Sequence, residues 1–330
     1  MSSAGMLDVF LTCDTEIWCD GWSGIDQKFP DAFARYVYGR DARGRANGLP
    51  LQLELLQQHG LHGVFFVEAL FTGRFGIGPL QEIVGLIRAA GQEVQLHLHP
   101  EWADESRSRW LPHVPEKRQH LRYFGADDQT TLLEAGIRAL QEAGAPRPTA
   151  FRAGSYALNA DTLEALAQVG IRIDSSYNAT MLGDSSGLAP GRRLADAARF
   201  DELLEFPVSY FRDGFGRWRH AQLGACAFEE LRDALWSARR GGLRAFVIVF
   251  HNFELLNQTK RGRDPTVVRR FERLCRFLAD HSKDFCCRGF ADMSAEGYVV
   301  RDAMDDPLLT VGLPSTVRRH WEQAVRRLAG

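Results

Sequence analysis

Two histidines lie two residues apart at the end of an apolar segment, in the stretch QLHLHPEW. Side chains alternate between the two faces of a β-strand, so His97 and His99 are expected to point into the fold together. Two imidazoles and one carboxylate can hold a divalent cation and leave positions open for water. The pattern predicts a metal site, and buried histidines with a purely structural role are the alternative.

A pair of carboxylates follows the first apolar segment of the chain, in the stretch TCDTE. The same alternation places Asp14 and Glu16 on one face of that expected strand. One carboxylate can bind a cation while the other remains free as a base, which is the division of work that a hydrolytic metal site needs. Ordinary acids at an exposed strand end are the alternative.

Three further strand ends carry polar residues. Arg152 is expected to point inward and therefore needs a carboxylate partner, for which Asp14 is the candidate. Asp174 emerges from a short apolar run, where an acid is most often a cap. His251 ends the apolar run FVIVF, and an imidazole there has a pKa suited to proton transfer.

Short apolar runs alternate with segments of helical periodicity, which predicts parallel strands covered by helices. The expected strands cover residues 7–13, 63–69, 93–99, 149–154, 203–209 and 246–252. The expected helices cover residues 51–60, 79–91, 130–144, 160–170, 228–242 and 315–330. Long irregular stretches at 14–47, 100–126 and 177–200 follow strands, and in an α/β barrel such loops form the rim where substrate binds.

Length and composition fit one large globular domain over residues 1–330, with a C-terminal helical extension from about 305 to 330. Forty basic and 42 acidic residues give a formal charge of −2, so no general attraction to nucleic acid is expected. No apolar run approaches the roughly 20 residues of a membrane span. The N-terminal stretch lacks the basic and apolar regions of a signal peptide, so the expected location is cytoplasmic.

Taken in order, the five polar strand ends resemble the motifs of the polysaccharide deacetylase (NodB-homology, carbohydrate esterase) family. The resemblance extends over residues 7–254. It implies an irregular, TIM-like (β/α) barrel, typically of seven strands. The implied activity is metal-dependent hydrolysis of an N-acyl group, most often acetyl, from an amino sugar or saccharide, which releases acetate and a free amine.

The resemblance also implies a metal site. Its ligands would be Glu16, His97 and His99, with one divalent ion, zinc by default. Glu16 stands in for the family's aspartate, because Thr15 occupies the position where that aspartate often lies. The family's second histidine comes four residues after the first, where this chain has Glu101, so His99 or Glu101 is the third ligand.

The remaining roles follow from the same resemblance. Asp14 would be the catalytic base, oriented and tuned by Arg152. His251 would be the general acid, tuned by Asp174. The backbone near two residues of the third motif, Ser155 and Tyr156, would bind the oxyanion.

Aromatic residues in the expected rim loops are candidates for stacking on sugar rings. The candidates are Trp18, Trp22, Trp102 and Trp110. The alternative functions are hydrolysis of a cyclic amide or ureide, with or without a metal, and carbohydrate binding without catalysis. Oligomeric state does not follow from the sequence.

Overall fold

The computed structural model describes residues 5–113, 116–183, 186–188, 193–295, 297–300 and 308–329. Parts of the expected loop 177–200 and the start of the expected C-terminal extension, residues 305–307, lie outside this range. The chain divides into two compact units. The first unit comprises Met1–Gly63, Ser209–Arg288 and Asp305–Gly330, and the second comprises Val64–Val208 and Gly289–Met304. The expectation of a single domain stays a prediction.

The first unit is built on parallel strands. Strand β1 (Leu7–Thr15) pairs with β10 (Ala245–His251) and with β11 (Phe285–Cys287), in parallel in both cases. Apart from Asp8, the side chains of β1 are buried on both faces, as is usual for a parallel strand covered on each side. The register pairs Asp14 with His251, so the polar ends of β1 and β10 lie next to each other.

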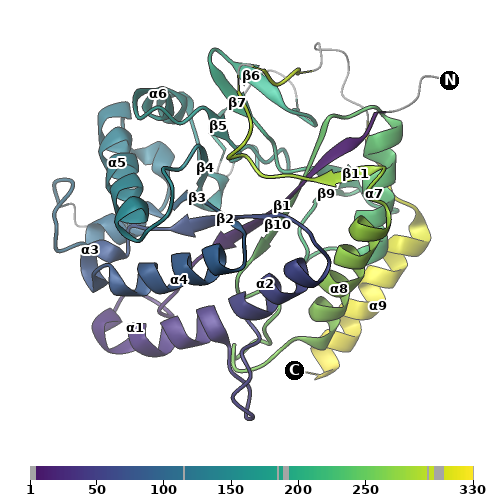
Figure 1. Ribbon diagram of the computed structural model, residues 1–330, viewed down its shortest axis with the longest axis horizontal. Coiled ribbons are helices and arrows are strands. Elements are labelled where there is room, and N and C mark those ends of the chain that lie inside the picture. Colours follow the sequence, from purple (N-terminus) through teal and green to yellow (C-terminus); the bar gives the residue numbers. More distant parts are fainter. Residues whose placement is uncertain are drawn as a thin grey trace. The chain divides into compact units, whose positions relative to one another are not determined.

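Helices and one hairpin complete the first unit (Figure 1). The helices are α1 (Ile25–Phe33), the π-helix η1 (Ala34–Tyr38), α2 (Leu49–Gln58), α7 (Phe228–Arg240), α8 (Pro265–Asp280) and α9 (Leu313–Ala329). The antiparallel hairpin pairs β8 (Tyr210–Arg212) with β9 (Trp218–His220). Helix α7 packs against both α8 and α9.

The second unit contains five parallel strands in the order β2-β3-β4-β5-β7, and β6 pairs antiparallel to β7. The strands are β2 (Gly63–Glu68), β3 (Glu93–Leu98), β4 (Ala150–Ala153), β5 (Ile173–Asp174), β6 (Ala198–Phe200) and β7 (Leu203–Glu205). The helices are α3 (Thr72–Phe75), α4 (Gly78–Ala89), η2 (Pro100–Glu105), η3 (Leu121–Tyr123), α5 (Ala126–Glu142), η4 (Gly154–Tyr156) and α6 (Ala160–Gln168).

Helix α5 lies close against β3, and a glycine makes this possible. A Cβ atom at Gly136 would lie 2.8 Å from a methyl group of Leu96 and 2.9 Å from one of Leu98. The absence of a side chain at this position therefore lets α5 support the strand that carries both histidines.

All six expected strands are present, as β1, β2, β3, β4, β7 and β10. Helix α8 was not expected, although Asp264 caps its N-terminus by accepting hydrogen bonds from Thr266 and Val267, with Pro265 in the first turn. These are strong helix-start signals in the sequence. The other unexpected strands have two or three residues, which is too short for an alternating pattern to show.

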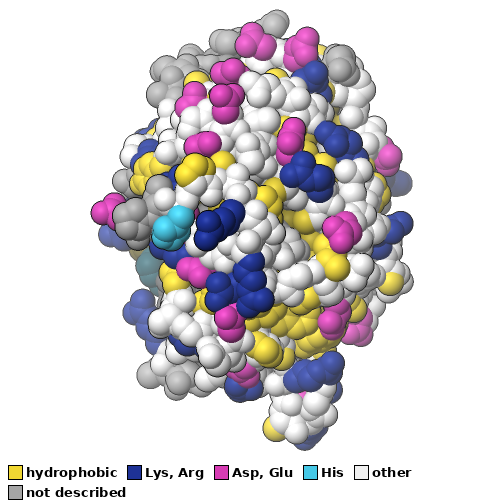
Figure 2. All heavy atoms as spheres, turned by 90° about the vertical axis from the view of Figure 1, so that its left-hand side faces the viewer, with side chains coloured by type: hydrophobic (Ala, Val, Ile, Leu, Met, Phe, Trp, Pro, Cys, Tyr) yellow, Lys and Arg dark blue, Asp and Glu magenta, His cyan; other side chains and the backbone are white. Residues whose placement is uncertain are grey.

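Charges of both signs are spread over the surface seen in Figure 2, where Lys and Arg side chains alternate with Asp and Glu. This agrees with the nearly balanced formal charge of −2. Among the described residues, no helix has the length and apolar character needed to cross a membrane.

Candidate active-site residues

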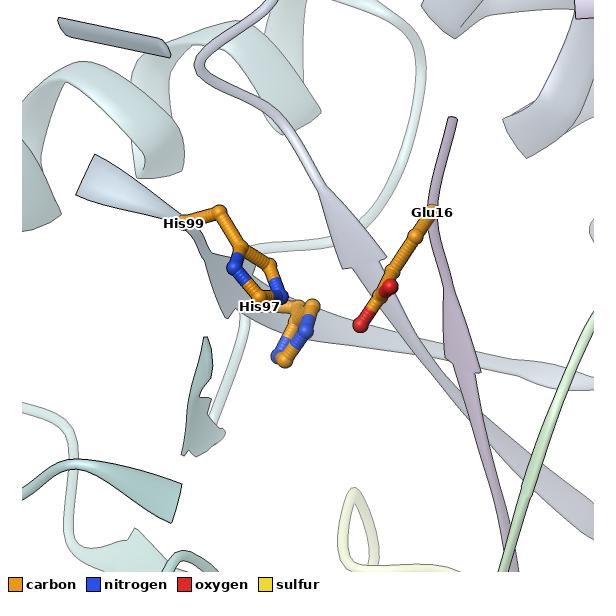
Figure 3. Close-up of side chains that lie close together, drawn as sticks. All are labelled: Glu16, His97 and His99. Carbon is orange, nitrogen blue, oxygen red and sulfur yellow. The ribbon is translucent and has the colours of Figure 1, made fainter. Parts of the chain in front are cut away.

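The two histidines of the second unit lie side by side at the end of β3 (Figure 3). Their ring centroids are 4.9 Å apart and the ring planes are nearly perpendicular, at 79°. Both side chains are buried, although imidazole is a polar group that needs partners in such a place.

One ring nitrogen of His97 forms a hydrogen bond with the backbone. Its Nδ1 lies 2.8 Å from the carbonyl oxygen of Arg152, which is its register partner on β4. Because a carbonyl oxygen can only accept, Nδ1 is the donor in this contact, and Nε2 is the ring nitrogen through which His97 could bind a metal. Metal-binding histidines are commonly oriented by such a bond to a backbone carbonyl.

His99 is placed by two close neighbours. A Cβ atom at Gly154 would lie 2.7 Å from the His99 ring, so the glycine provides the space that the ring occupies. Oε2 of Glu101 lies 3.6 Å from Nδ1 of His99. This arrangement favours His99 as a ligand and Glu101 as the carboxylate beside it, rather than Glu101 as a replacement.

Arg152 is fully buried in the second unit. Its Nε donates to the carbonyl oxygen of Ser175 and its Nη2 to the hydroxyl of the same residue, both at 2.8 Å. The guanidinium also lies over the ring of Phe66, 4.4 Å from its centroid. The side chain is therefore rigid, as a group that orients another residue has to be.

Asp174 forms a buried carboxyl pair with Glu205, its register partner on β7. Burial raises the pKa of both groups, and for Glu205 the neighbouring charge of Asp174 raises the pKa further. The hydroxyl of Ser176 donates to Asp174 at 2.5 Å. The pair therefore holds a proton to a higher pH than two separate carboxylates would.

Ser155 and Tyr156 have positive φ angles of 56° and 58°. Two successive residues other than glycine in this region are uncommon, and such strain is found most often at functional sites. The short helix η4 that contains them follows β4 directly.

In the first unit, Asp14, Glu16 and His251 come together at the ends of β1 and β10. Ligand atoms of the three residues lie within 4.8 Å of one another. Nε2 of His251 is 4.0 Å from Oε1 of Glu16. The sequence analysis predicted the three residues, and the parallel register of the two strands accounts for their proximity.

Asn252 holds the segment after β1, a role that the sequence analysis did not predict. Its Oδ1 accepts from the backbone N–H of Glu16 at 2.9 Å, and its Nδ2 donates to the carbonyl oxygen of Glu16 at 3.1 Å. Nε1 of Trp18 in turn donates to Oε2 of Glu16 at 2.7 Å. The one sequence feature that pointed to Asn252 is its position directly after His251.

Nδ1 of His251 has a carboxylate partner within the first unit, and the predicted role of Asp174 stays a prediction. It lies 2.9 Å from Oε1 of Glu254 in the first unit. Burial by itself lowers the pKa of this imidazole. The hydrogen bond to Glu254 and the charges of Glu16 and Asp14 outweigh burial and raise the pKa to about 9. The ring is thus protonated at neutral pH, as a proton donor must be.

The predicted sugar-stacking residues differ in exposure. Trp102 lies in the core of the second unit, 1% exposed, with its ring against those of Phe71 and Phe75. It is therefore corrected from a substrate contact to a core residue. Trp18 and Trp22 are partly exposed and pack edge to face, with centroids 6.1 Å apart.

Similarity to solved structures identifies the fold. A proposed polysaccharide deacetylase from Mycobacterium smegmatis aligns over 99% of this chain and 93% of its own, with a TM-score of 0.53 and 20% identity. A family 4 carbohydrate esterase from Streptomyces lividans in complex with acetate aligns over 89% and 95%, with a TM-score of 0.41 and 15% identity. A CE4 family pseudoenzyme from Bacillus anthracis aligns over 85% and 63%, with a TM-score of 0.41 and 11% identity.

Searches of family models and of curated proteins gave no match. The alignment over nearly the whole of both chains with the mycobacterial structure shows that this chain has the polysaccharide deacetylase fold. The predicted NodB-like α/β fold is thereby confirmed.

Proposed function

We propose that the protein is a metal-dependent hydrolase that removes an acetyl group from the nitrogen of an amino sugar. The observation that carries the proposal is the pair of buried imidazoles at the end of β3, where His97 is oriented by the hydrogen bond from its Nδ1 to the Arg152 carbonyl oxygen and the ring of His99 lies 4.9 Å away. Metal-binding histidines are commonly oriented by such a bond to a backbone carbonyl.

The donor set fits a divalent ion. Glu16, His97 and His99 would supply one carboxylate oxygen and two imidazole nitrogens, the set for which zinc is the default and cobalt, nickel, iron and manganese are alternatives. When bound, the ion would act as a Lewis acid on the amide carbonyl. The positions of His97 and His99 on β3 support their role as ligands. The role of Glu16 is inferred from the sequence pattern.

The chain's own residues would move the protons. Asp14 accepts a proton from the attacking water, whose oxygen forms the new bond to the acetyl carbon. His251 donates a proton to the nitrogen as the C–N bond breaks, giving acetate and a free amine. Backbone groups near Ser155 and Tyr156 stabilise the charge on the carbonyl oxygen, and Arg152 orients Asp14.

The substrate is proposed to be a nucleotide- or lipid-linked amino sugar, because we expect a cytoplasmic protein that meets sugar precursors before it meets finished polymers. Trp18 is the aromatic side chain best placed to touch the sugar, since its indole is partly exposed and bonded to Glu16.

The test measures acetate and free amine released from a nucleotide-linked N-acetyl amino sugar and from N-acetylated oligosaccharides. We expect equal amounts of the two products, loss of activity with a chelator and recovery with zinc. Asp14→Asn should lower kcat by about 100-fold to 10,000-fold, the usual contribution of a general base. Release of no acetate from any of these substrates with metal supplied would refute the proposal, and metal-independent opening of a cyclic amide would support the alternative.

A further inference from the structure

His251 and Glu254 form a compact turn at the end of β10. The backbone N–H of Glu254 donates to the carbonyl oxygen of His251 at 3.0 Å, which brings the Glu254 side chain back toward the imidazole. Oε1 then lies 2.9 Å from Nδ1 of the ring. The opposite ring atom, Nε2, faces Glu16.

The carboxylate of Glu254 is enclosed by hydrogen-bond donors. Nε2 of Gln222 donates to Oε1, and the backbone N–H of Gly224 donates to Oε2 at 2.6 Å. The side chain is 8% exposed. A group with three donors around it must be an acceptor at each oxygen, and a carboxylate is the side chain that meets this condition.

Gly224 can lie this close because it has no side chain. A Cβ atom there would lie 2.8 Å from Oε2 of Glu254. The same residue is held from the other side, since Nη1 of Arg270 donates to its carbonyl oxygen at 3.0 Å. Arg270 is fixed by Glu322 of α9, with Nε and Oε2 2.8 Å apart. The carboxylate therefore sits in a rigid frame.

We propose that Glu254 is the positioning residue of His251. By accepting the hydrogen from Nδ1, it fixes the ring so that Nε2 is the atom that delivers a proton to the leaving nitrogen. This inference rests on the proposed function for the identity of the reaction, but the hydrogen bond itself can be measured without activity. It gives a role to Glu254, to which the sequence pattern assigned none.

The decisive variant is Glu254→Gln. A glutamine has nearly the same shape but only one acceptor oxygen, so it cannot accept from Gln222, Gly224 and His251 together. With the amide oxygen toward Nδ1, the hydrogen bond loses its charged acceptor and the NH2 faces the N–H of Gly224. With the NH2 toward Nδ1, the neutral ring would have to accept at Nδ1 and carry its proton on Nε2. Glu93→Gln is the matched control, because Glu93 is also a buried carboxylate that accepts backbone hydrogens, from Phe290 and Ala291.

The assay compares two substrates on the same enzyme sample. Hydrolysis of an N-acetyl amino sugar needs a proton on the departing nitrogen, whereas 4-nitrophenyl acetate expels a stable phenolate that needs none. We expect Glu254→Gln to lower the ratio of the amide kcat to the ester kcat at least about 10-fold, a part of what a general acid contributes. The fraction of folded protein cancels in this ratio. An equal loss on both substrates, or the same change in Glu93→Gln, would overturn the proposal.

A second measurement does not depend on activity. Proteins labelled with nitrogen-15 at histidine are compared by NMR, and the His251 signals are assigned from their loss in His251→Ala. We expect Nδ1 to carry a proton in the wild type, and its nitrogen-15 signal to shift in Glu254→Gln because the charged acceptor is lost. Unchanged Nδ1 signals would overturn the inference. A wild-type protein that hydrolyses neither substrate but shows the expected NMR change would refute the proposed function and leave the Glu254–His251 pairing intact.

Discussion

Peptide groups around β4 contact both histidines of β3. The Arg152 carbonyl oxygen determines which nitrogen of His97 carries the proton, and the bare Cα of Gly154 leaves room for the ring of His99. The backbone of β4 and Gly154 thus orients two imidazoles whose spacing was already visible in the sequence. The sequence showed the ligand types, but the contacts that orient them depend on a neighbouring strand.

Replacement of Gly154 tests whether this space matters. In Gly154→Ala, the new methyl group would lie 2.7 Å from the His99 ring, so the ring must move. We expect zinc affinity to fall by about 10-fold to 100-fold, as for other changes that misplace a metal ligand. The measurement is zinc titration against a competing chelator.

Gly85→Ala is the control for that substitution. Gly85 lies inside α4, and a Cβ atom there would meet no neighbour within 4 Å. This change should leave zinc affinity as it is and stabilise the protein by about 0.5–1 kcal/mol, since alanine favours a helix. Equal zinc affinity in Gly154→Ala and the wild type would show that the position of His99 does not depend on the glycine.

The pairing of strands β5 and β7 brings two carboxyl groups together. Their register places Asp174 beside Glu205, and burial raises the pKa of both. A two-residue strand such as β5 shows no alternation in the sequence, so this pairing was not predictable from pattern. Asp174 was predicted as a site residue, but its carboxyl partner Glu205, two strands further along the chain, was not.

The pair predicts how stability depends on pH. A carboxyl whose pKa is raised on folding favours the folded state fully below its unfolded pKa, near 4.5 for glutamate, and this contribution is lost as the pH rises. The slope is at most about 1.4 kcal/mol per pH unit for one proton. In Glu205→Gln, the amide donates to Asp174 at every pH, so we expect a flatter dependence between pH 5 and pH 8 by denaturant unfolding.

Glu202→Gln is the matched control, because the side chain of Glu202 is 79% exposed. It should keep the wild-type slope. If Glu205→Gln shows the same slope as well, the buried pair does not hold the proton that the structure assigns to it.

The strands and helices of the fold could be predicted from the sequence more fully than the hydrogen-bond partners of the site residues. Apolar runs and helical periodicity are local, and they predicted the strands that end in Asp14, His97 and His251. The roles of Glu254 and Asn252 were not predicted, because they depend on hydrogen bonds that form only after the turn at the end of β10. Trp102 was misplaced because an aromatic residue in a loop has the same sequence pattern whether it is buried or exposed.

The proposed mechanism depends on one catalytic metal ion that the chain binds through His97. The measurement is metal content by mass spectrometry, after incubation with zinc and removal of excess, on the wild type, on His97→Ala and on the control His59→Ala at the end of α2. We expect about one ion per chain in the wild type and in the control, and close to none in His97→Ala. A wild type without metal, or a His97→Ala protein with full occupancy, would contradict the proposed mechanism.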